Sequence, residues 1–66
     1  MNNAVNTTII NSYIEANKLS KAKFCKLCKI SIYAFNKIMT GQDFDIINIF
    51  RIAKAMNIRV CELFRN

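Results

Sequence analysis

Apolar residues recur every three or four positions along most of this chain, the spacing that places side chains on one side of an α-helix. The first such run predicts a helix that ends at about Asn17. Either Asn6 or Thr7 can cap its N-terminus. Its apolar face comprises Ile9, Ile10, Tyr13 and Ile14. Residues 1–6 are polar and rich in asparagine, and we expect them to form a flexible arm or the frayed lead of this helix.

The stretch from Leu19 to Gly41 predicts two short helices joined by a tight turn. Ser20 and Ser31 are residues of the type that caps helix N-termini, and each precedes apolar residues at helical spacing. We expect helices at about 21–28 and 32–40, with Gly41 ending the second in the left-handed conformation. The expected core residues of the two helices are Phe24, Cys28, Ala34, Phe35 and Ile38. Helices this short need flanking segments to complete a core.

The C-terminal third predicts one longer helix and one short helix. The longer helix begins at a cap, either Asp43 or Asp45, and ends near Met56, with Asn57 as its left-handed C-cap. Its expected buried residues are Ile46, Ile49, Phe50, Ala53 and Met56. A last helix at 60–64 returns Leu63 to the core, although Arg59 is a weak cap.

Length and composition favour a single all-α domain that spans residues 1–66, a compact bundle of about five short helices. More than half of the 66 residues are apolar (53%), there is one glycine, and there is no proline. No apolar run reaches the length of a membrane span, and the N-terminus lacks the basic flank of a secretion signal. We therefore expect no membrane association and a cytoplasmic location.

The positive charge is concentrated in one part of the chain. The net charge is +6, and residues 18–37 contain six lysines and no acid, whereas the flanking segments are nearly balanced. A basic patch of this kind suits a polyanionic partner. A solvated lysine-rich surface is the plainer alternative.

The three cysteines raise the question of metal or redox chemistry. Cys25 and Cys28 form C-x-x-C, but the chain has no histidine and Cys61 is the only further soft ligand, so a four-ligand zinc site is incomplete. A reactive dithiol belongs at a helix N-terminus, and these two cysteines fall in mid-helix. We expect buried structural thiols, no metal and no cofactor.

The spacing of these features resembles a known family. The pattern L-S-x-x-x-F-C-x-x-C-x-I-S-x-x-x-F-x-x-I-x-x-G, from Leu19 to Gly41, is similar to the helix-turn-helix of the phage Cro/repressor-type (XRE-like) DNA-binding proteins. The likeness extends from about Ile10 to Phe64 and includes the A-K-A-M-N-I run that begins at Ala53. It implies a lambda-repressor-like fold and a small sequence-specific regulator of transcription, a repressor or Cro-like protein of phage, mobile-element or bacterial origin, that binds double-stranded DNA.

The resemblance also implies roles for individual residues, because the second helix of such a motif enters the major groove. The residues that match base-facing positions are Ile32, Tyr33, Asn36 and Lys37. The residues expected to hold phosphates are Lys21, Lys23, Lys37, Thr40 and Gln42. Ile32 is as easily a partly buried residue as a contact, and Leu27 either packs on the first helix or is an exposed contact.

Two positions depart from the family pattern. Lys29 stands where many members carry glycine in the turn, and a left-handed lysine costs about 1 kcal/mol relative to glycine. Ile14 and Met39 stand where members often carry an arginine and a glutamate that form a buried ion pair. Since both partners are apolar here, we predict that Ile14 and Met39 pack together.

Two other functions compete with DNA regulation. One is a protein-interaction module of the antitoxin type that uses the same fold to bind a toxin, with DNA binding secondary. The other is an enzyme, which we do not expect, because the chain lacks histidine, a glycine-rich phosphate loop and an acid–base pair placed for catalysis. Homodimerisation through Leu63, Phe64 and the end of the fourth helix is an open alternative to their being ordinary core.

Overall fold

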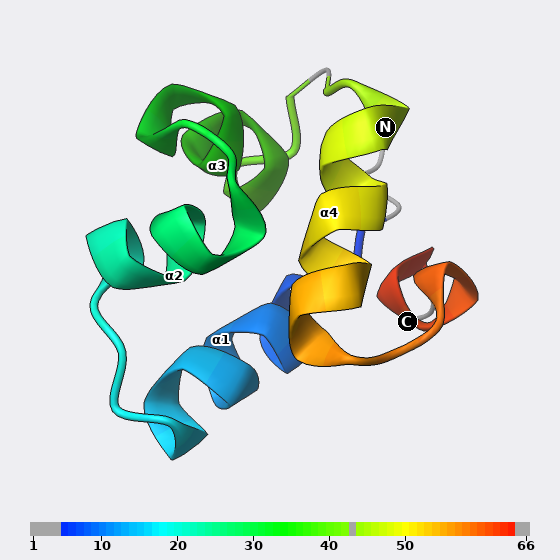
Figure 1. Ribbon diagram of the computed structural model, residues 1–66. Coiled ribbons are helices and arrows are strands. Elements are labelled where there is room, and N and C mark those ends of the chain that lie inside the picture. Colours follow the sequence, from blue (N-terminus) through cyan, green and yellow to red (C-terminus); the bar gives the residue numbers. More distant parts are fainter. Residues whose placement is uncertain (1–4, 43, 65–66) are drawn as a thin grey trace.

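The computed structural model describes residues 5–42 and 44–64, and within these ranges it contains helices and no strand. Figure 1 shows α2 and α3 on one side of the molecule, α4 on the other, and α1 beneath them. The elements are α1 (Thr7–Ala16), α2 (Lys21–Cys28), α3 (Ile32–Met39), α4 (Ile46–Met56) and η1 (Val60–Phe64). The prediction of a compact all-α chain is confirmed, with the difference that the last element is a 3₁₀ helix.

Three polar side chains fix the starts of the first three helices. Asn6 Oδ1 accepts a hydrogen bond from Ile9 N at 3.3 Å, Ser20 Oγ from Lys23 N at 3.1 Å, and Ser31 Oγ from Ala34 N at 3.0 Å. Each bond satisfies one of the N–H groups that a helix leaves without an internal partner. Asp45 occupies the cap position of α4, but its side chain makes no capping hydrogen bond, and the alternative cap, Asp43, lies outside the described residues.

Left-handed residues separate the helices where the sequence predicts turns. Lys29 ends α2 at φ 62° and ψ 43°, Gly41 follows α3 at φ 80°, and Asn57 ends α4 at φ 60°. The backbone N–H of Ile30 then donates to Cys25 O at 3.0 Å, which closes the end of α2. The lysine in the turn therefore adopts the conformation that glycine favours.

All five elements contribute to one core. Its completely buried side chains are Ile10, Phe24, Ile38, Ile49, Ile52 and Leu63. The Phe24 ring lies between Tyr13 and Phe35, with centroid distances of 5.9 Å and 5.8 Å. Burial of Leu63 confirms that the last helix returns to the core, and it removes Leu63 from any contact between two copies.

The N-terminal lead is packed where the structure describes it. Val5 is buried, and the backbone N–H of Asn6 donates to Leu63 O at 2.6 Å. Val5 and Asn6 are therefore tied to η1 and lead directly into α1, which differs from the flexible arm expected for residues 1–6. Residues 1–4 lie outside the described part of the chain.

The expected buried face of α4 is wrong at two positions. Ile46 and Phe50 are each 51% exposed, whereas Ile52 is completely buried. The buried face of α4 consists of Ile49, Ile52, Ala53 and Met56, at the i, i+3, i+4, i+7 spacing. Phe50 follows Ile49 directly, so it is rotated by about 100° around the helix axis, away from this face. Ile46 is the first residue of α4, and Figure 1 shows that α1 and η1 lie beside the other end of this helix.

Ile14 and Met39 come to the same part of the molecule. Both are half-buried, and both line one surface hollow of about 430 Å³ between α1, α2 and α3. Direct packing of one side chain on the other stays a prediction. Among the described residues, no helix combines the length and apolarity that crossing a bilayer requires.

Candidate nucleic-acid interface

The surface of α3 follows from its short amphipathic sequence. Ser31 starts the helix, and Phe35 and Ile38 turn into the core, as predicted. Ala34, also predicted to face inward, is half-buried and lines a hollow together with residues at the start of α4. The remaining side of α3 is left for solvent.

The four predicted base-facing residues lie on this outer side of α3 or at its edge. Tyr33 is 73% exposed, Asn36 is exposed, and Lys37 is half-buried. Ile32 keeps 44% of its surface exposed, so it is not a core residue, and its contact with DNA stays a prediction. The Nζ atom of Lys37 lies 5.3 Å from the centroid of the Tyr33 ring, within the range of a cation–π contact.

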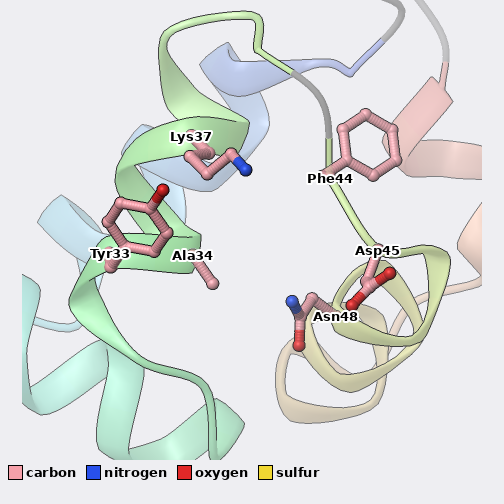
Figure 2. Close-up of a pocket in the computed structure, with 6 residues that line it drawn as sticks. All are labelled: Tyr33, Ala34, Lys37, Phe44, Asp45 and Asn48. Carbon is pink, nitrogen blue, oxygen red and sulfur yellow. The ribbon is translucent and has the colours of Figure 1, made fainter.

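A hollow of about 330 Å³ separates this side of α3 from the start of α4. Figure 2 shows Tyr33, Ala34 and Lys37 on one wall and the second wall opposite them, with the side chains of Lys37 and Asn48 extending into the space between. The second wall consists of Phe44, Asp45 and Asn48. Phe44 is held there by a ring contact with Phe64, at a centroid distance of 6.4 Å.

Sequence reasoning missed this second wall. The sequence pattern assigns Asn48 neither to the core face of α4 nor to its outward face. It indicates Asp45 only as a helix cap. The available signal was the shortness of the link from Gly41 to Asp45, which brings the start of α4 close to the end of α3.

Of the five residues predicted to hold phosphates, Lys37 is half-buried and the other four are exposed, but these are not equally free to donate. The Thr40 hydroxyl donates to Asn36 O at 2.7 Å and accepts from Gln42 Nε2 at 3.0 Å. Since a phosphate oxygen only accepts hydrogen bonds, Thr40 has no donor left in this arrangement. Gln42 retains one side-chain N–H, and Lys21 and Lys23 are both exposed to solvent.

The structure brings some of these residues together and leaves others apart. Lys21, at the start of α2, lines the hollow of about 430 Å³ together with Asn36 and Thr40 of α3. Lys23 lines none of the hollows described here, and Gln42 joins the group only through its hydrogen bond to Thr40.

Two of the three cysteines, Cys25 and Cys28, behave as buried apolar residues. Cys25 and Cys28 are buried in α2, as predicted, and Cys61 is exposed on η1. Burial raises the pKa of the Cys28 thiol to about 12, with a smaller contribution from Cys25. Burial also raises the pKa of the Cys25 thiol, against an opposing effect of Lys21. Within residues 5–42 and 44–64, no three histidine, cysteine or acidic side chains gather in a way that could hold a metal ion.

Comparison of the chain with protein-family models, with curated proteins and with solved structures finds no match.

Proposed function

We propose that this protein binds double-stranded DNA in a sequence-specific manner and acts as a small transcriptional regulator. In this proposal α2 and α3 form a helix-turn-helix of the Cro/repressor type. α3 enters the major groove, Tyr33, Asn36 and Lys37 contact base edges, and Lys21, Lys23 and Gln42 contact phosphates.

The observation that carries the proposal is the outer side of α3. It is open to solvent, it presents a tyrosine, an asparagine and a lysine on neighbouring turns, and none of the residues of α2 or α3 is acidic. Asparagine can pair with adenine through two hydrogen bonds, and lysine can donate to guanine. A merely solvated helix surface does not require this side to be free of acids.

The charge distribution supports the same proposal. The lysines of residues 18–37 lie on α2, on α3 and in the turns that flank α2, and all except the half-buried Lys37 are exposed. Their charges raise the local concentration of a polyanion and favour its approach to this side of the molecule. The left-handed Lys29 also gives the tight turn between the two helices that the motif requires.

A second candidate is a protein-interaction module of the antitoxin type. The observation that favours it is the exposure of large apolar side chains on α2 and α3. Leu27 is 54% exposed and lines a hollow together with residues of α4, and Ile32 is 44% exposed. A surface that binds only DNA does not need an exposed leucine such as Leu27.

Selection of binding sites from a pool of random duplexes tests the main proposal. We expect a recurrent sequence to emerge, and we expect the affinity for it to fall with salt at a log–log slope of about −4 to −5 if five phosphates are neutralised per chain. Asn36→Ala should reduce the preference for that sequence over random DNA, whereas Glu15→Ala, on the exposed side of α1, should leave it unchanged. No enriched sequence together with a salt slope near zero would refute the proposal.

A further inference from the structure

A second surface, formed by the end of α2 and the outer side of α4, has no role in the proposed DNA contact. We call it the α2–α4 face. It includes Leu27 and Lys29, which line a hollow together with Arg51 and Lys54 of α4. It also includes the exposed Ile47 and Phe50, which helical spacing places on the same side of α4 as these two cations. None of these residues lines the hollow beside Tyr33 and Lys37, so the face is distinct from the outer side of α3.

The α2–α4 face exposes three large apolar side chains. Leu27, Ile47 and Phe50 are 54%, 53% and 51% exposed, although α4 already fills its share of the core through Ile49, Ile52, Ala53 and Met56. Ile47 and Phe50 precede Arg51 and Lys54 by one helical turn each, so they share the outer side of α4 with these two cations. Large exposed apolar side chains that share one side of a helix with cations are typical of a contact surface for another macromolecule.

A hollow of about 390 Å³ lies within this face. Its walls are Leu27, Cys28 and Lys29 from α2 and its C-cap, and Arg51, Lys54 and Ala55 from α4. Three of these six residues are cationic, none is acidic, and the other three are apolar. Such a hollow accepts an apolar side chain between groups that attract carboxylates.

Arg51 is held in position at the rim of this hollow. Its Nη1 atom donates to Lys29 O at 2.9 Å, which links α4 to the turn after α2. The other N–H groups of the guanidinium stay available, and they suit the two oxygens of a carboxylate. A donor already fixed by the fold loses less entropy when it binds.

From these observations we infer that the α2–α4 face docks an acidic, amphipathic helical segment of another protein. Its apolar side chains contact Leu27, Ile47 and Phe50, and its carboxylates meet Lys29, Arg51 and Lys54. A second copy of this chain fits less well, because the net charge is +6 and the same cations of both copies would enter the contact. Duplex DNA supplies anions but leaves the three apolar side chains without partners.

A peptide-binding experiment tests this inference with the intact chain. The probe is a fluorescein-labelled synthetic helix of leucine and glutamate, with leucines at i, i+3, i+4 and i+7, and the reference is a scrambled peptide of the same composition. We expect fluorescence anisotropy to show at least about tenfold tighter binding of the amphipathic peptide than of the scrambled peptide. The affinity should fall with added salt.

Variants locate the binding surface. Phe50→Ala and Lys54→Glu should each weaken the amphipathic peptide about tenfold, and circular dichroism should show an unchanged helix content, since both side chains are exposed. Asn36→Ala, on α3, should leave the peptide affinity unchanged. Because this assay contains no nucleic acid, its result is independent of the proposed DNA binding, which Asn36→Ala tests separately.

Three results would overturn the inference. The first is equal binding of the two peptides, which would mean that charge alone attracts them. The second is self-association in sedimentation equilibrium that Phe50→Ala abolishes, because a second copy would then cover the face. The third is duplex DNA binding that Phe50→Ala and Lys54→Glu both remove, since the α2–α4 face would then be part of the nucleic-acid surface.

Discussion

The ammonium nitrogen of Lys37 lies 5.3 Å from the centre of the Tyr33 ring, one helical turn away on α3. The contact holds a flexible four-carbon side chain close to an aromatic surface and reduces the entropy that Lys37 loses on binding. In the proposed interface, Tyr33 therefore acts through Lys37 in addition to any contact of its own with DNA.

The first prediction separates these two roles of Tyr33. Tyr33→Phe keeps the ring and the cation–π contact, whereas Tyr33→Leu removes both. If Tyr33 positions Lys37, the leucine variant should lose about tenfold in discrimination at the base pair that Lys37 contacts, and the phenylalanine variant should lose little. The measurement is the affinity for the selected duplex and for its single-base variants. A loss of the same size in both variants would mean that the hydroxyl group, and not the ring, matters.

The second prediction concerns the contrast between Lys37 and Lys21. Lys37→Ala should relax the preference at one base pair, while Lys21→Ala should weaken all duplexes alike and lower the steepness of the salt slope by about 0.9. The reason is that a phosphate contact carries no sequence information. Titrations of the specific duplex and of a random duplex at several salt concentrations check this. Indistinguishable effects of the two substitutions would contradict the assigned roles.

The helices of this chain were predictable because their signals are local. Ser20 and Ser31 cap α2 and α3, and Asn57 ends α4, each in the position where its chemistry indicated. Such signals depend on a few neighbouring residues and on backbone preferences, so they do not require knowledge of what packs against the helix.

The exposed side of α4 and the second wall of the hollow were not predictable in the same way. Periodicity cannot say which residues of the first turn of a helix reach the core, so Ile46 was assigned to the core although it is 51% exposed and only Ile49 of that turn is completely buried. Phe50 was misassigned because an apolar residue beside a buried stripe has the same sequence signal as one within it. The second wall depends on how α3 and α4 pack, which is a tertiary property.

The third prediction uses the left-handed conformation of Lys29. Lys29→Gly should stabilise the chain by about 1 kcal/mol, because glycine adopts φ 62° without the steric cost that a lysine side chain incurs. The backbone carbonyl that accepts the Arg51 hydrogen bond is unchanged by this substitution. Urea unfolding followed by circular dichroism measures the change. Lys26→Gly, within α2, is the matched control and should destabilise by about 1 kcal/mol. Destabilisation by Lys29→Gly would contradict the argument.

The fourth prediction tests whether Ile14 and Met39 pack together. Met39→Glu alone should destabilise the chain by about 1–3 kcal/mol, because it replaces a half-buried apolar side chain that packs against the core with a carboxylate. Adding Ile14→Arg should recover much of this loss by pairing the charge. A double-mutant cycle from urea unfolding gives the coupling energy, which we expect to exceed 0.5 kcal/mol. Strict additivity of the two substitutions would show that the side chains do not interact.

The last prediction concerns the pH dependence of stability that the buried Cys28 thiol creates. Its pKa is raised to about 12, from an ordinary value of 9.0 that it regains on unfolding. Between these two values the unfolded chain releases the thiol proton and the folded chain keeps it, so the unfolded state binds fewer protons and stability falls as pH rises. This contribution is complete below pH 9 and is lost progressively from about pH 9 to about pH 12. Urea unfolding at a series of pH values should show a decline in this range that is shallower in Cys28→Val, where no thiol can ionise. Cys25, whose thiol pKa is also raised, leaves a residual slope in that variant. An identical decline in the parent chain and in Cys28→Val would mean that the Cys28 thiol does not cause the alkaline loss of stability.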